Sequence, residues 1–338
     1  MWTRVLLIVF TGLLFLGCSQ DDQVVNVYSG RHYQVDEDLF RAFTEKTGIR
    51  VNLVKADTDQ LLNRLEMEGA NSPADLLITA DAGRLVTAAA TGLLQPIVSD
   101  FIQESIPVSL RDPENRWVAM TKRARVIVYH NDRVRSEDLS TYEALAEPEW
   151  EGRVLVRSSQ NHYNQTLMAS VIAALGHDAA EIWAGRLVQN MARRPRGNDR
   201  DQVKAIVAGE GDVAIVNTYY MGLLKYSVNP EERLVAEQTR IFFPNQEGRG
   251  THVNYSGIGL TAASKNPDNA TRLIEFMLKP ESQQKLAEEN HEYPVNKEVV
   301  WPELLQSWGT FIADERPLYE LEPYLRDAMF IFNRAGWN

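Results

Sequence analysis

Short strand-like runs alternate with helical patterns along almost the whole chain, and this alternation restricts the fold more than any other feature. Val24-Val25-Asn26-Val27 has the composition of a buried strand. A helical pattern follows, with Leu39, Phe40 and Phe43 on one face, and it stops at Gly48, a residue suited to a helix C-cap. Repetition of this unit predicts an α/β fold of layered sheets and helices.

The repeats fall into two sets. The segment 122–130 is predicted to be a strand that leaves the first set, and the Gly-, Asn- and Pro-rich stretch 242–255 is predicted to cross back. Two lobes, each an open and mostly parallel sheet flanked by helices, then enclose a ligand cleft. The remaining expected strands are 51–54, 75–79, 154–156 and 212–216, and the expected helices are 61–65, 83–90, 165–175, 203–207, 270–278 and 281–290.

The length of the chain also favours two lobes, because 338 residues exceed what one typical core organises. We predict a signal segment at 1–18. The first lobe comprises 19–121 with about 245–297, and the second comprises 122–244 with about 298–338.

The N-terminus has the features of an export signal. Arg4 precedes the apolar stretch Val5 to Gly17, which is short for a membrane span. Cys18, the only cysteine, follows this stretch as in the lipobox of bacterial lipoproteins, although Phe15 stands where leucine is usual. We therefore predict a lipid anchor at Cys18, in the periplasm or on the outer face of the cell membrane. The alternative is an ordinary cleaved signal with an incidental cysteine, and either way the protein leaves the cytoplasm.

The charge balance narrows the choice of partners. The formal net charge is -11, which argues against nucleic acid, since that partner requires clustered cations. An acidic protein is compatible with a cationic ligand. With a single cysteine the fold has no internal disulfide, so a large apolar core must hold it.

Four tyrosines stand where three predicted strands end. Tyr33 follows the first strand, Tyr163 follows the strand 154–156, and Tyr219 with Tyr220 follows the strand 212–216. Ligands of open α/β sheets bind beyond the carboxyl ends of the strands. If the two lobes face one another, these four side chains can converge. Taken singly, each would more often be a core or loop tyrosine.

A cluster of phenolates favours one kind of cation. A phenolate is a hard, anionic oxygen donor, whereas zinc and copper favour sulfur or imidazole, and calcium and magnesium favour carboxylates and carbonyls. Several phenolates suit a small, highly charged cation, above all Fe(III). His32 could add a nitrogen ligand from the first lobe.

Three segments carry a resemblance to a known family. Arg31-His32-Tyr33, Asn161-His162-Tyr163-Asn164-Gln165 and Asn217-Thr218-Tyr219-Tyr220 resemble the metal-binding segments of periplasmic ferric-iron-binding proteins, the bacterial transferrins. The spacing of these segments is similar too, and the resemblance covers nearly all of the chain after Cys18. It implies the two-lobe fold of type II periplasmic solute-binding proteins and capture of Fe(III), the transported ligand.

The resemblance also implies a ligand set and partners. His32 and Tyr33 match the version of the family in which the first lobe offers a histidine and a tyrosine and the second offers three tyrosines. His162 departs from the family pattern, and its role, bystander or extra ligand, stays open. The implied partners are an ABC permease and its ATPase, with this chain a monomer. Whether Fe(II) binds, and whether an anion or water completes the coordination shell, also stays open.

Arg123 and Arg125 lie on the predicted crossing strand 122–130. Alternate residues of a strand share a face, and their charge is placed at lowest cost toward the cleft. Four phenolates around Fe(III) leave one net negative charge, which a nearby arginine could offset. We assign this role to Arg123; the alternative is a surface salt bridge.

Three other functional classes are the alternatives, and one of them is a lipoprotein scaffold with no ligand. An enzyme is disfavoured because the chain has no Gly-x-Ser-x-Gly, His-Glu-x-x-His or Gly-x-x-x-x-Gly-Lys motif. A binding protein of the same fold could instead hold a polyamine, thiamine or a phosphonate. Such sites combine aromatic walls with carboxylates or arginines and do not need adjacent tyrosines at these positions.

Overall fold

The computed structural model describes residues 23–338, so the predicted signal segment and Cys18 lie outside the described residues. The described chain is an α/β structure whose sheet follows the order β2-β1-β3-β9-β5-β7-β6. The strands are β1 (Val24–Ser29), β2 (Arg50–Lys55), β3 (Leu76–Thr79), β4 (Leu94–Gln95), β5 (Trp117–His130), β6 (Val154–Leu155), β7 (Val213–Asn217), β8 (Thr239–Phe242), β9 (Val253–Thr261) and β10 (Tyr293–Pro294).

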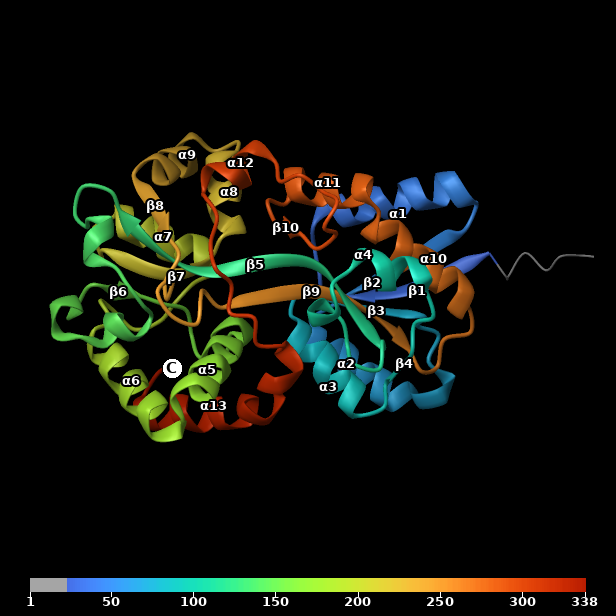
Figure 1. Cartoon of the computed structure of the whole chain (residues 1–338), viewed down its shortest axis with the longest axis horizontal. Helices are drawn as coiled ribbons and strands as arrows, with labels where there is room; N and C mark the ends of the chain where they lie inside the picture. The colour runs from blue at the N-terminus through green and yellow to red at the C-terminus, as the bar shows by residue number, and fades with distance from the viewer. Residues whose placement is uncertain (1–22) are drawn as a thin grey trace, which may run out of the picture.

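Helices flank both parts of this sheet (Figure 1). They are α1 (Gln34–Thr47), α2 (Thr58–Glu68), α3 (Ala82–Ala90), α4 (Asp100–Ser105), α5 (His162–Leu175), α6 (His177–Gln189), α7 (Asp199–Val207), α8 (Tyr219–Lys225), α9 (Pro230–Glu237), α10 (Pro267–Leu278), α11 (Pro280–Glu289), α12 (Glu303–Ser307) and α13 (Glu322–Ala335). No helix of residues 23–338 is long and apolar enough to cross a membrane.

Strand β5 connects two lobes. Its residues Trp117 to Ala124 pair with β9, whereas Arg125 to Tyr129 pair with β7. In Figure 1, α1, α10 and α11 cover one face of the first-lobe sheet and α2 and α3 the other, while α7 to α9 and α5, α6 and α13 enclose the second lobe. The predicted α/β fold of two lobes is therefore confirmed.

The pairing directions differ from the predicted, mostly parallel sheets. The outer strands are parallel, since β1 pairs in parallel with β2 and β3, and β6 with β7. Both long central strands are antiparallel to their neighbours. The sheet is mixed because two strands that cross between lobes in opposite directions pair antiparallel with each other and with the strands beside them.

Apolar burial explains why the helices form where they do. In α1, Leu39, Phe40 and Phe43 pack against the sheet, and Gly48 ends the helix in the left-handed conformation at φ 73°. A second apolar cluster joins α5, α6 and α13 to β6 and β7, with Leu187 and Phe332 fully buried. In each lobe a packed apolar core thus fixes the positions of the strand ends.

Candidate functional site

All four predicted tyrosines lie at junctions where a strand passes into a helix. Tyr33 is the N-cap residue of α1, and Tyr219 and Tyr220 open α8 directly after β7. Tyr163 lies in the first turn of α5, where the side chain of the N-cap Asn161 accepts a hydrogen bond from its backbone N–H at 3.2 Å. The helix predicted at 165–175, which left Tyr163 in the preceding loop, therefore begins about one turn too late. The reason is that Asn161 caps the helix before the apolar pattern begins.

The four rings meet between the lobes. The rings of Tyr33, from the first lobe, and Tyr219, from the second, lie edge to face with centroids 6.2 Å apart. The hydroxyl oxygens of Tyr163 and Tyr219 are 3.4 Å apart. The rings of Tyr219 and Tyr220 have centroids 4.1 Å apart. Three distant segments of the chain thus form one cluster, with Tyr219 at its centre.

The cluster is enclosed. Tyr219 is 1% exposed and Tyr163 is 7% exposed, while Tyr33 and Tyr220 are half-buried. Burial raises the pKa of Tyr219 well above its usual range, and the neighbouring Tyr163 and Tyr220 add to the shift. Burial likewise raises the pKa of Tyr33 and of Tyr220. All three phenols therefore stay protonated at neutral pH until a bound cation displaces their protons.

Arg123 and Arg125 both lie behind the cluster, as the alternation along β5 predicted. Both are almost fully buried, and their guanidinium carbons are 5.1 Å and 5.8 Å from the centroid of the Tyr163 ring. Arg123 donates to the Ser256 hydroxyl at 3.0 Å. A surface salt bridge, the alternative weighed for this pair, does not describe such buried side chains.

Comparison with known proteins gives the family. Residues 38–313 match the model of bacterial extracellular solute-binding proteins. The chain belongs to this family. It is 47% identical over 317 residues to "Iron uptake protein A1" of Synechocystis, covering 94% of this chain and 88% of that protein. It is 30% identical over 281 residues to the "Major ferric iron-binding protein" of Neisseria meningitidis, covering 82% of each.

Solved structures agree with the fold. A Trichodesmium protein solved in complex with iron and citrate superposes with a TM-score of 0.89 at 45% identity, covering 93% of this chain and all of that one. The "Ferric binding protein from Campylobacter jejuni" superposes with a TM-score of 0.89 at 42% identity over the same shares. The two-lobe type II fold is therefore shared with these proteins.

His32, a predicted ligand, and His162, whose role the sequence left open, have different surroundings in this solute-binding protein. His32 is exposed in this structure, so the structure does not bring it into the enclosed cluster. The ring of His162 packs edge to face on Tyr163, with centroids 4.4 Å apart. Its buried Nε2 has no hydrogen bond within the described chain, and burial lowers its pKa.

Sequence reasoning missed the acidic partners of the buried arginines. Arg31 lies 4.7 Å from the centroid of the Tyr33 ring and pairs with Asp36 at 2.8 Å and with Glu292 at 3.0 Å. Burial alone would raise the pKa of Glu292, but Arg31 and Arg123 hold it below its usual range. Arg31 belongs to a segment that carries the family resemblance, yet nothing in the sequence indicated its pairing with Glu292.

Asp199 is the acidic partner of a buried arginine in the second lobe, as Glu292 is in the first. Its carboxylate pairs with Arg125 and, at 2.7 Å, with Arg157. Asp199 is fully buried, and although burial alone would raise its pKa, the two arginines lower it. The ion pair with Asp199 therefore gives the buried Arg125 a counter-charge close to Tyr163.

We expect Asp199→Asn to lower the free energy of unfolding of the iron-free protein by about 3–5 kcal/mol, because it leaves the buried Arg125 and the partly exposed Arg157 without a counter-charge. Since the pKa of Asp199 is lowered, the wild-type stabilisation exists above the ordinary carboxyl range and fades as pH falls through the lowered value. Urea denaturation at neutral pH measures the loss. Asp327→Asn, which removes the partner of the exposed His177, is the control and should leave the midpoint unchanged. Equal midpoints for both variants would contradict the assignment.

Proposed function

We propose that this solute-binding protein captures Fe(III) between its lobes through the phenolate oxygens of Tyr33, Tyr163, Tyr219 and Tyr220, and delivers it to an ABC permease driven by its ATPase. One observation carries the proposal: four tyrosines from three separate strand ends converge in one enclosed cluster. Relatives named for iron uptake and ferric iron binding cover most of the chain.

The donor set fits a trivalent cation. Among residues 23–338 no group of three or more His, Cys, Asp and Glu side chains is placed to hold a metal ion, so the phenols are the donors on offer. A bound trivalent ion stabilises the phenolates that burial otherwise disfavours. Four phenolates and Fe(III) leave one negative charge, and Arg123 lies beside Tyr163 to offset it.

The arginines around the cluster have carboxylate partners. Asp36 and Glu292 pair with Arg31, and Asp199 pairs with Arg125 and with the partly exposed Arg157. Arg123 lies 3.9 Å from Glu292 and near the buried Asp81, so a counter-charge holds each buried cation in place beside the tyrosines. His32 stays a predicted ligand; its exposed side chain would have to turn toward the cluster to bind.

A visible absorption spectrum tests the proposal. Phenolate–Fe(III) complexes absorb visible light by charge transfer, so the purified protein after Cys18 should gain colour on addition of Fe(III) and lose it on chelation. A polyamine, thiamine or phosphonate complex, the alternative function, is colourless. A protein that stays colourless with a stoichiometric excess of Fe(III) would exclude the tyrosine-cluster proposal.

The cellular setting is part of the same proposal. We infer that the protein works as a monomer outside the cytoplasm, that its lobes have the boundaries predicted from the sequence, and that Cys18 carries a lipid. The match to extracellular solute-binding proteins supports the location. The anchor rests on the sequence alone.

Cys18→Ser should release the protein from the membrane fraction or block its processing, because one acylated residue is its only proposed tether. Fractionation of cells that express the wild type and the variant measures this. The Fe(III) affinity of the purified variant should be unchanged. A wild-type protein found wholly in the soluble fraction would contradict the anchor and leave the iron site untouched.

A further inference from the structure

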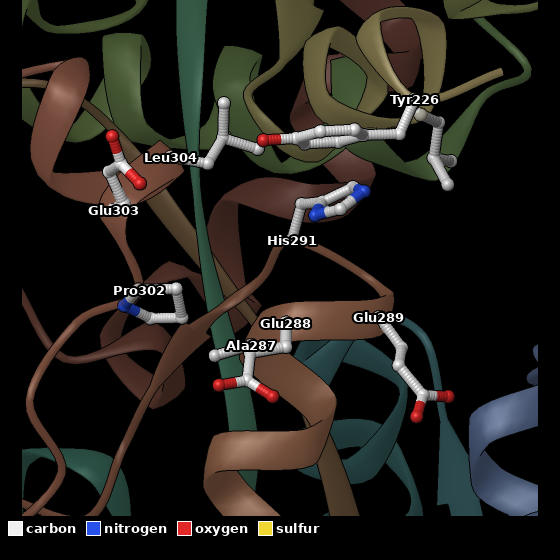
Figure 2. Close-up of a pocket in the computed structure, with 9 residues that line it drawn as sticks. Tyr226, Ala287, Glu288, Glu289, His291, Pro302, Glu303 and Leu304 are labelled. Atoms are coloured by element: carbon white, nitrogen blue, oxygen red, sulfur yellow. The ribbon is translucent and has the colours of Figure 1, made fainter.

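A cavity opens between α8 and α11, and none of the four cluster tyrosines lines it (Figure 2). It has a volume of about 510 Å³, which is in the range of small-molecule sites. Leu223 and Tyr226 line it from α8 of the second lobe and its C-cap. The other lining residues come from α11, the turn after it and α12, and they are Ala287, Glu288, Glu289, His291, Pro302, Glu303 and Leu304.

His291 is the unusual residue of this cavity. It is 6% exposed, and its imidazole makes no hydrogen bond or ion pair with any described residue. Its ring stacks on Tyr226, with centroids 5.3 Å apart, and Figure 2 shows it lying under that ring. An imidazole that lines a cavity without a hydrogen-bonding partner is available to a molecule that enters it.

The fold holds His291 in place at some cost. Its backbone lies in the left-handed region at φ 58°, which few residues other than glycine adopt. A Cβ atom at Gly222 of α8 would stand 2.4 Å from the His291 ring, so only glycine at 222 lets the helix approach this closely. Burial lowers the pKa of His291 to about 4, and the ring is therefore neutral at neutral pH, with one N–H donor and one acceptor.

The charge of the lining has one sign. Glu288, Glu289 and Glu303 are exposed at the cavity, and no lysine or arginine is among the lining residues. Glu303 has no ion-pair partner in the part of the chain that the structure describes, whereas Glu289 pairs with Lys285 at 3.6 Å. The Lys225 ammonium lies 5.9 Å from the centroid of the Tyr226 ring, but three carboxylates outnumber it at the cavity, which therefore favours a cation over an anion.

The walls indicate which kind of cation fits. No group of three or more His, Cys, Asp and Glu side chains in residues 23–338 is placed to hold a metal ion, so a bare metal ion lacks a ligand set at this cavity. Leu223, Pro302 and Leu304 supply apolar surface beside the Tyr226 ring. Carbon-lined walls suit the body of an organic molecule, and carboxylates at the rim suit its ammonium group.

We propose that this cavity binds a small organic cation, with its apolar body against Tyr226 and Leu304, its ammonium group near Glu288 and Glu303, and a hydrogen bond to the His291 imidazole. The site is separate from the tyrosine cluster and does not depend on iron. Its occupant contacts residues of both lobes, since Tyr226 follows α8 and His291 follows α11.

Calorimetric titration of the iron-free protein tests this with three probes of similar shape: phenethylamine, phenethyl alcohol and hydrocinnamate. Phenethylamine should bind about tenfold more tightly than the neutral alcohol, and the anion should not bind. The double variant Glu288→Gln/Glu303→Gln should weaken phenethylamine by about tenfold. His291→Asn, which tolerates the same backbone conformation, should also weaken it.

Glu45→Gln is the matched control, because it removes an exposed carboxylate on α1 outside the cavity and should leave phenethylamine binding unchanged. Circular dichroism of each variant confirms that it folds. Equal binding of the three probes, no binding of phenethylamine at millimolar concentration, or a double variant that binds like the control would each overturn the proposal. The readout needs no iron, so it stands apart from the tyrosine-cluster test.

Discussion

Replacing Tyr219 with phenylalanine is expected to weaken Fe(III) binding by at least about a thousandfold, which corresponds to ~4 kcal/mol. Tyr219 is the centre of the cluster: its ring contacts those of Tyr33 and Tyr220, and its hydroxyl oxygen lies 3.4 Å from that of Tyr163. The substitution removes one anionic donor and keeps the ring. Coordination is therefore lost while the packing that closes the lobes is kept.

The folded state should tolerate this change. Within residues 23–338 the only hydrogen-bonding partners of the Tyr219 hydroxyl are other tyrosines of the cluster. Removing this hydroxyl therefore leaves no buried group outside the site without a hydrogen bond. Tyr220→Phe is expected to act in the same way. Thermal unfolding of the iron-free variants should match the wild type within the small effect of one buried hydroxyl.

A competition titration against a ferric chelator measures the affinity. Tyr255→Phe is the matched control, because Tyr255 is also buried, at 9% exposure, but lies on β9 outside the cluster. The control should bind iron as the wild type does. If Tyr219→Phe and Tyr220→Phe also bind as tightly as the wild type, the phenols are not the iron ligands.

The tyrosine cluster could be predicted because its geometry follows from topology. Tyr33, Tyr163 and Tyr219 each lie where the chain passes from a strand to the next helix, and strand ends of an α/β fold meet at the ligand side. The two-lobe fold was predictable for a related reason, since β5 was recognisable as one long strand between two sets of α/β repeats. Its start at Trp117, five residues before the predicted 122, changes nothing at the site.

Side-chain partners across the sequence could not be predicted in this way. Arg31 meets Glu292, and Arg125 meets Asp199, only because the folded lobes bring distant segments together. A charged residue in a sequence is more often on the surface, and nothing local distinguishes a buried one. The antiparallel pairing of β5 with β9 was missed for the same reason, because register between distant strands leaves no local signal.

The histidines show where a motif and a structure disagree in detail. His32 was predicted to be a ligand from the resemblance and its neighbour Tyr33; its side chain is exposed, and it precedes the N-cap of α1. His162, which departs from the family pattern, contacts Tyr163 instead. Adjacent residues at a strand–helix junction point in different directions, so adjacency to a ligand is weak grounds for a second ligand.

The second large effect concerns pH. Lowering the pH by one unit should reduce the apparent Fe(III) association constant by up to about four powers of ten, because each of four phenols must lose a proton to bind. Burial raises the pKa of Tyr33, Tyr219 and Tyr220, so these three groups are fully protonated in the iron-free protein around neutral pH. Iron binding must therefore displace their protons at every pH in that range.

The direction of this pH dependence follows from the protonation of the iron-free and the iron-bound site. The iron-free site holds protons at Tyr33, Tyr219 and Tyr220, whose pKa values are raised, and the bound cation removes them, so protons and iron compete for the same oxygens. Affinity accordingly falls as pH drops and rises as it increases, without a plateau below the raised pKa values. His162 works in the same direction only weakly, since burial already lowers its pKa and keeps the ring neutral.

Counting protons separates phenolate coordination from any other role of the rings. The competition titration is repeated at two pH values one unit apart, against a chelator whose own protonation is known. The slope of the logarithm of affinity against pH should fall by about one in Tyr219→Phe, since one displaced proton is gone, and should stay at the wild-type value in Tyr255→Phe. If Tyr219→Phe loses affinity but keeps the wild-type slope, the tyrosine shapes the site without giving up a proton to the metal.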